Sequence, residues 1–119
     1  MRIMTEAYKD REYFIPLDAR RSEGLYGRPL SSSQRRRIAQ EALLEAGGDV
    51  VMAGHLEMVK TLQAGLTNWI GMYDMAGEEI PFSAEAVKAA CEYDVDLMNS
   101  FAIRLKNIAR YGDEEDEKN

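Results

Sequence analysis

The sequence of 119 residues contains a single cysteine, Cys91, and a single histidine, His55. One cysteine excludes an internal disulfide, and this pair of residues supplies neither a zinc site nor a Cys–His catalytic pair. No apolar stretch approaches the roughly 18 continuous residues of a membrane-spanning helix. No apolar segment follows Arg2 as it would in a secretory signal. These absences predict a protein of a reducing cytoplasm, with no metal and no membrane contact.

A glycine-rich phosphate-binding loop is also missing. Gly24-Leu25-Tyr26-Gly27 has neither the dinucleotide-binding nor the P-loop spacing. His55 has no partner in the sequence that would make it a general base, so we expect it to be a packing residue. The 21 carboxylates lie mostly in the C-terminal tail or on predicted helix faces. The composition therefore predicts a small acidic domain that is not an enzyme and needs no cofactor.

Hydrophobic residues make up 45% of the sequence, which is enough for one folded domain of this length. Charge is uneven: residues 1–60 contain 10 Lys and Arg against 9 Asp and Glu, whereas residues 61–119 contain 5 against 12. Five consecutive acidic residues, 113–117, stand near the C-terminus and would repel one another. We therefore predict a single domain over residues 1–111 and a disordered acidic tail over residues 112–119.

The first 30 residues are predicted to form an N-terminal arm. The segment 12–17 is aromatic and β-branched, but Pro16 lacks a donor for a strand ladder, so it predicts an edge strand. Residues 20–30 contain Gly24, Gly27 and Pro29, which are typical of a loop. A loop of this length is expected to be ordered by a partner.

Residues 31–111 are predicted to form a helical core. Ser31 and Gln34 have the spacing of a capping box, and Gly47 ends the helix that they begin. Asp49 caps a second helix that we extend to about residue 70, because its apolar positions recur three and four residues apart. Ser83 caps a third helix to about residue 93, and a fourth runs from about 95 to 110. The predicted fold is mainly α, a small four-helix domain with an irregular or short-strand N-terminal segment.

A run of turn-forming and aromatic residues follows the second predicted helix, in the order Trp69, Gly71, Asp74, Gly77, Pro81, Phe82, Ser83 and Glu85. This order resembles the tail assembly chaperones of long-tailed phages and prophages, which share Trp-x-Gly, Asp-x-x-Gly and Pro-Phe-Ser/Thr-x-Glu in a small, acidic, mostly helical chain. The likeness is close over about 17 residues and looser over residues 49–110. The same residues also suit a purely structural role, because Trp69 and Phe82 flank a turn and can pack together.

The resemblance implies a non-enzymatic protein of the bacterial host cytoplasm. It would bind the tape measure protein, keep its apolar helical segments soluble and help to recruit tail tube protein. We expect the partner to contact apolar residues of the second helix and its surroundings, namely Leu56, Val59, Leu62, Leu66, Met72, Met75 and Tyr26. An apolar surface without its partner is expected to associate with itself, so we also expect a homo-oligomer.

A small helical regulatory or adaptor protein, antitoxin-like or transcription-associated, is the alternative function. Arg20, Arg21 and the triplet 35–37 would then contact a partner. We do not expect this partner to be nucleic acid, because the chain has a formal net charge of −6. The helix–Gly-Gly–helix over residues 31–70 is also not expected to be a DNA-binding helix-turn-helix, since Lys60 is the only Lys or Arg of its second helix.

Overall fold

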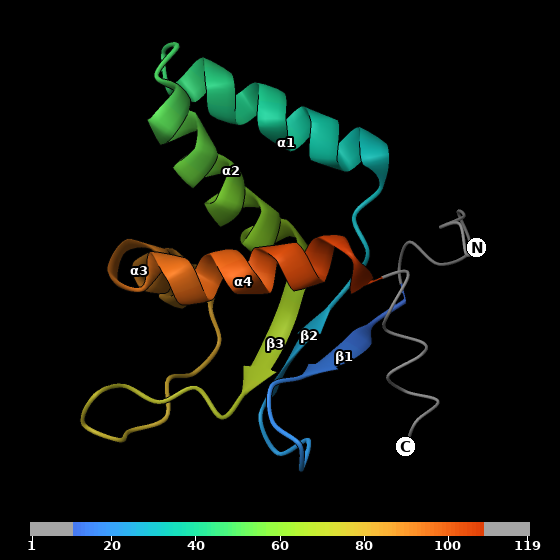
Figure 1. Cartoon of the computed structure of the whole chain (residues 1–119), viewed down its shortest axis with the longest axis vertical. Helices are drawn as coiled ribbons and strands as arrows, with labels where there is room; N and C mark the ends of the chain where they lie inside the picture. Colours follow the sequence, from blue (N-terminus) through green and yellow to red (C-terminus); the bar gives the residue numbers. More distant parts are fainter. Residues whose placement is uncertain (1–10, 109–119) are drawn as a thin grey trace.

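The computed structural model describes residues 11–108, which form four helices and a three-stranded antiparallel sheet (Figure 1). The mainly α prediction is therefore confirmed in part: the four helices are present, but the sheet was not predicted. The predicted acidic tail, residues 112–119, lies outside the described residues. The elements in chain order are β1 (Tyr13–Pro16), β2 (Gly24–Gly27), α1 (Ser32–Glu45), α2 (Val50–Gly65), β3 (Leu66–Ile70), α3 (Ala84–Tyr93) and α4 (Val95–Lys106).

The helix starts agree with their predicted caps. The Gln34 backbone N–H donates to Oγ of Ser31 at 3.1 Å, and the Ser31 N–H donates to Oε1 of Gln34 at 2.8 Å, which completes the capping box of α1. Oδ1 of Asp49 accepts from two backbone N–H groups of α2, and Oγ of Ser83 accepts from Ala86 N–H in α3. Asp94 alone separates α3 from α4 and caps α4. These local signals therefore fix where each helix begins.

The sheet has the strand order β1-β2-β3, so β1 is an edge strand, as the proline in it requires. The prediction of a loop over residues 20–30 was wrong, because Gly24–Gly27 is the central strand. Its two glycines are needed for close packing: a Cβ on Gly24 would overlap the ring of Phe14, and one on Gly27 would lie 2.6 Å from Cδ1 of Leu105. Leu25 between them is fully buried, so the segment is held by the core of this chain.

The second helix is shorter than predicted. It ends at Gly65, and residues 66–70, which we expected to be helical, form β3. Pairing with β2 places Leu25 opposite Trp69 and Gly27 opposite Leu66, with a bulge that leaves one extra residue in β3. The bulge allows Leu66 and Trp69, three residues apart, to be buried together in a strand.

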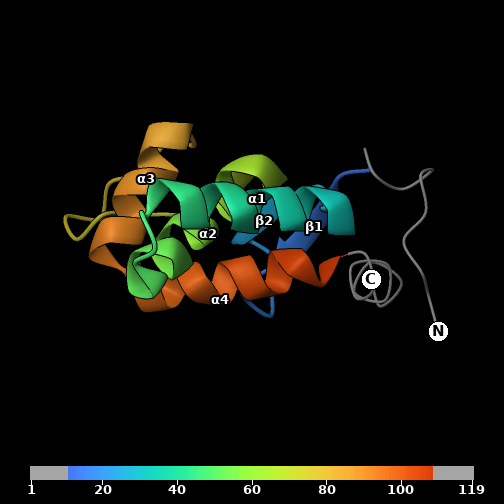
Figure 2. The same ribbon diagram turned by 90° about the horizontal axis from the view of Figure 1, so that it is seen from above.

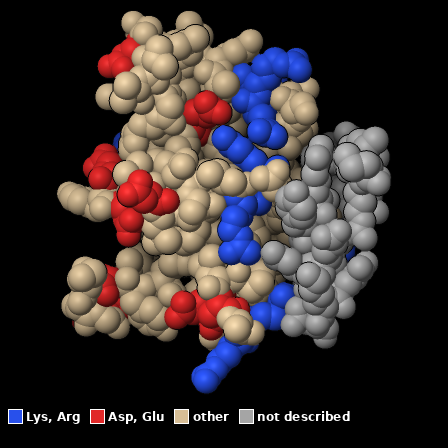
Figure 3. Space-filling model, in the orientation of Figure 1, with Lys and Arg blue, Asp and Glu red and all other residues tan. Residues whose placement is uncertain are grey.

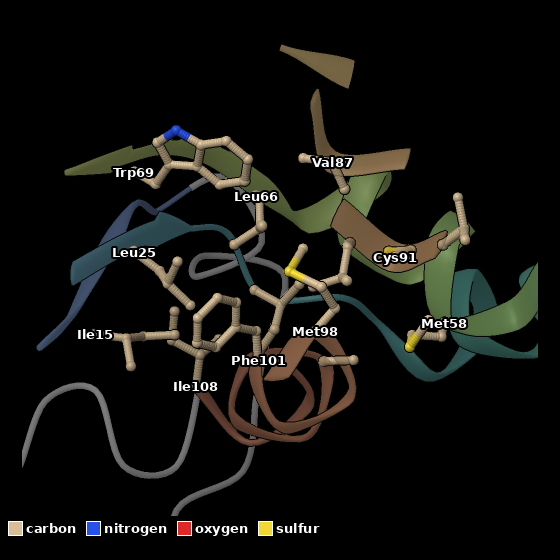
Figure 4. Close-up of a cluster of buried hydrophobic side chains, with 14 of the residues drawn as sticks. Ile15, Leu25, Met58, Leu66, Trp69, Val87, Cys91, Met98, Phe101 and Ile108 are labelled. Atoms are coloured by element: carbon tan, nitrogen blue, oxygen red, sulfur yellow. The ribbon is translucent and has the colours of Figure 1, made fainter. Parts of the chain in front are cut away.

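The core lies between the sheet and helices α2, α3 and α4. Figures 1 and 2 show α4 crossing one face of the sheet. The Arg104 guanidinium on α4 donates to the carbonyl of Pro16 in β1 at 3.0 Å, which fixes that crossing. Figure 4 shows the buried side chains meeting from all of these elements: Ile15, Leu25, Met58, Leu66, Trp69, Val87, Cys91, Met98, Phe101 and Ile108.

Cys91 is a fully buried free thiol on α3, and its burial raises the pKa of the thiol. Because the thiolate is the reactive form, both effects oppose modification. We expect a thiol-specific reagent at neutral pH to react with the native protein roughly 100-fold more slowly than with the urea-unfolded chain, which corresponds to an opening free energy of about 3 kcal/mol. The absorbance of the chromophore that the reagent releases on reaction measures both rates. Equal rates would contradict the packing of α3 on the core.

Candidate protein-binding surface

Helices α1 and α2 form an antiparallel hairpin that projects away from the sheet (Figure 1). Gly47 and Gly48 in its turn have φ of 61° and 90°, a left-handed backbone that glycine adopts without strain. The Lys60 ammonium and the Glu45 carboxylate, 2.7 Å apart, join the two helices, and this contact raises the pKa of Lys60. The buried side of α1 consists of Ile38 and Ala42. The hairpin is thus held together by its glycine turn, the ion pair between its helices and a narrow apolar contact along α1.

The hairpin tip, defined here as residues 43–52, carries five exposed apolar side chains. Leu44, Val50 and Val51 are 81%, 77% and 84% exposed, and Leu43 and Met52 are about half exposed. Two carboxylates, Glu45 and Asp49, are the only charged groups in the segment. Contiguous exposed apolar side chains on a small protein commonly mark an interaction site. The tip is therefore the surface of the described chain most suited to binding a protein.

None of the residues that we predicted to contact a partner lies in the hairpin tip. A signal was present in Leu43-Leu44 and Val50-Val51, because each pair is adjacent in a helix and neighbouring residues point about 100° apart. Both members of such a pair rarely reach the same narrow seam. Two apolar doublets on either side of Gly47-Gly48 therefore indicate an exposed end.

Three of the predicted contact residues belong to the core. Val59 and Leu62 on α2 and Leu66 on β3 are 7%, 0% and 5% exposed, so their apolar stripe is covered by this chain itself. The stripe packs against the sheet and α4 of the same chain and not against a partner protein. These three residues are therefore not available to a second protein in the folded chain.

The four other predicted contact residues differ in their exposure. Leu56 on α2 is half-buried, and Tyr26 packs on Phe14, with 4.9 Å between the ring centroids. Met72 is partly buried against the core, whereas Met75 is fully exposed in the loop after β3. These positions come from different elements, and Met75 is the most exposed of the four.

The run from Trp69 to Glu85 forms a compact structural unit. Trp69 is 7% exposed, and its Nε1–H donates to the carbonyl of Ile80 at 2.7 Å. Its ring meets that of Phe82 edge to face, with the centroids 5.3 Å apart and the planes at 87°. The predicted cluster of Trp69 and Phe82 is therefore present. It closes the loop of residues 71–83 against β3.

The turn within this loop is set by Asp74 and Gly77. Oδ1 of Asp74 accepts from Ala76 N–H at 2.9 Å and from Glu78 N–H at 3.0 Å, and Gly77 has φ of 84°. Gly71, with φ of 80°, leaves room for the side chain of Glu23, where a Cβ would overlap it. The exposed Pro81 leads into the Ser83 cap, and Glu85 stands in the first turn of α3. Each motif residue thus has a folding role.

Arginines gather on a second surface. Between residues 20 and 37 there are six arginines and one glutamate, and Arg28 with the triplet 35–37 is exposed around the start of α1. Figure 3 shows the Lys and Arg side chains in a band along one side of this face, with most of the Asp and Glu side chains on the other side. Charge is therefore segregated on the surface as well as along the sequence.

Residues 11–108 contain no group of three or more His, Cys, Asp and Glu side chains that could hold a metal ion. His55 is half-buried on α2. In the same range, no helix has both the length and the apolar character needed to cross a membrane. In this range the hairpin tip and the exposed arginines around the start of α1 are candidate binding surfaces.

Comparisons of this chain with protein-family models, with curated proteins and with solved structures found no match.

Proposed function

We propose that this chain is a non-enzymatic tail assembly chaperone of a phage or prophage, acting in the cytoplasm of the bacterial host. It binds the tape measure protein and helps to recruit tail tube protein. The observation that carries the proposal is the exposed apolar hairpin tip, because a protein that shields apolar helices needs such a surface. The order of residues from Trp69 to Glu85, which resembles that family, supports it further.

The tip suits an apolar helix better than a small ligand. Its exposed side chains flank the turn between α1 and α2, where the apolar stripe of a partner helix can contact them. The net charge of −6 would help to keep the complex soluble once that stripe is covered. This assignment replaces the buried stripe of α2 as the proposed contact for the tape measure protein.

Co-expression with the tape measure protein encoded by the same genome tests the proposal. We expect the wild-type chain to keep that protein soluble and to co-elute with it. The Leu44→Ser/Val51→Ser variant should bind about 100-fold more weakly, because two apolar side chains that each contribute about 1.5 kcal/mol on burial are lost. Both positions are exposed, so the melting temperature should stay close to that of the wild type.

Ile103→Ser is the matched control, because Ile103 is 53% exposed on α4 and lies outside the tip. It should bind as the wild type does. A wild-type chain that neither solubilises nor co-elutes with the tape measure protein would overturn the proposal, and so would a tip variant with unchanged affinity.

The alternative of a regulatory or adaptor protein is favoured by the exposed arginine triplet 35–37. A DNA column at low salt separates the two functions. The chaperone is expected to pass through it, whereas retention that depends on these arginines would favour a transcription-associated role.

A further inference from the structure

Two oppositely charged surfaces lie far apart on the described chain. Residues 74–96 contain seven Asp and Glu against one lysine, whereas residues 20–37 contain six arginines against one glutamate. In Figures 1 and 2, the start of α1 lies on the right of the described chain and α3 on the left. The arginines at the start of α1 are therefore separated from the carboxylates of α3.

The acidic surface has its most exposed part where α3 meets α4. Six consecutive residues, 92–97, are exposed, and they alternate three carboxylates with three apolar side chains. Tyr93 is 88% exposed, and Val95 and Leu97 are nearly half exposed. We call this segment the acidic corner. It presents negative charge beside apolar area, so apolar contacts there can be flanked by charged ones, as in the apolar core and polar rim of an interface.

The outer side of α1 has the matching composition. Arg36 and Leu43 are seven residues apart, as are Arg37 and Leu44, so each pair lies on one side of the helix about two turns apart. All four side chains are exposed, on the side away from the buried Ile38. We call these four residues the basic face. It carries arginine where the acidic corner carries carboxylate, and both carry apolar side chains.

We propose that the acidic corner of one copy of this chain docks on the basic face of a second copy. Charge complementarity selects the occupant, because each surface has its counterpart on the same chain. The two surfaces are different, so the contact is head-to-tail and can extend to further copies. The proposal concerns the chain alone and does not depend on the proposed function.

Such a contact depends on ionic strength, because exposed charges are screened within about 8 Å at 0.15 M salt and about 3 Å at 1 M. We expect sedimentation velocity at micromolar concentration to give species larger than 13.5 kDa at low salt. At about 0.5 M salt the association should weaken roughly tenfold or more. A wild-type chain that is monomeric at low salt would overturn the proposal.

Charge reversal distinguishes this contact from apolar self-association. The variants Arg36→Glu/Arg37→Glu and Glu92→Lys/Asp96→Lys should each be monomeric, because each would bring like charges together. Mixed in equal amounts, they restore the original pairing of acidic corner and basic face and add a second pairing with the signs exchanged, so the mixture should again give species larger than the monomer. Asp94 is left unchanged because it caps α4. Far-UV circular dichroism confirms that the variants are folded.

A single chain carrying all four substitutions should associate again, since both surfaces have then exchanged their signs. If the two variants fail to pair when mixed, or if either still self-associates at low salt, the head-to-tail contact is wrong. Self-association that instead disappears in the Leu44→Ser/Val51→Ser variant but survives both charge reversals would assign the contact to the hairpin tip.

Discussion

Trp69→Ala is expected to lower the free energy of unfolding by about 3–5 kcal/mol, the usual loss when a buried aromatic side chain is removed from a core. The indole is 7% exposed, packs edge to face on Phe82 and donates a hydrogen bond to Ile80. A small domain has only about 5–15 kcal/mol of stability in total. The variant should therefore be largely or partly unfolded at growth temperature. Urea titration followed by far-UV circular dichroism measures the loss without relying on the only tryptophan.

Trp69→Phe is the control for this experiment. Phenylalanine keeps an aromatic ring beside Phe82 but lacks the Nε1–H donor, so the Ile80 carbonyl loses one hydrogen bond. The loss of unfolding free energy should therefore be clearly smaller than for alanine. An alanine variant within about 1 kcal/mol of the wild type would show that the loop of residues 71–83 contributes little to stability.

The same result limits what the motif can reveal about function. Trp69, Asp74 and Gly77 hold a loop together, so replacing them would impair binding through loss of the fold. A binding defect in such a variant says nothing about the contact surface. Substitutions at the exposed hairpin tip separate binding from folding, because the tip side chains contribute little to the core.

The helix starts could be predicted from the sequence because their causes are local. Ser31 with Gln34, Asp49 and Ser83 each satisfy backbone donors within four residues of themselves. No distant residue changes that requirement, and the predicted caps are the observed ones. The clustering of Trp69 with Phe82 was also predictable, because the intervening turn residues bring the two rings back together.

The sheet could not be predicted in the same way, because its signals depend on distant residues. Leu66 and Trp69 have a helical spacing, and only the bulge opposite Gly27 makes that spacing fit a strand. Gly24-Leu25-Tyr26-Gly27 contains two residues that usually weaken strands. Glycine is needed at these two positions because Phe14 and Leu105 pack against them, and the sequence does not show that these residues are neighbours.

The prediction that Val59 and Leu62 are available to a partner was wrong for a related reason. An apolar stripe indicates that one side of a helix is buried. It does not indicate whether the residues that bury it belong to the same chain or to a partner protein. The apolar side of α2 is buried by the sheet and α4, so Val59 and Leu62 are not accessible to another protein. The exposed tip lies where that burial ends.

Gly65→Ala is expected to destabilise the protein by about 1–3 kcal/mol through overpacking. Gly65 is the last residue of α2, and a Cβ there would overlap Cδ2 of Leu105 and lie 3.0 Å from its Cγ. Leu105 cannot easily move away, because it is fully buried and its Cδ1 already fits against Gly27. The two glycines thus form a slot for one leucine, which locks α4 to the junction of α2 and β3. Urea titration measures the loss.

Gly54→Ala is a control in the same helix, and its expected change in the free energy of unfolding has the opposite sign. Gly54 is exposed within α2, and a Cβ there would meet nothing within 4 Å. Alanine should therefore stabilise the protein by up to about 1 kcal/mol, through its higher helix propensity alone. If overpacking against Leu105 is the cause, the loss at Gly65 should shrink or reverse in a Leu105→Ala background, as a double-mutant cycle measures. An unchanged loss in that background would show that Gly65 is required by its backbone conformation, and the slot for Leu105 would not be what holds α4 in place.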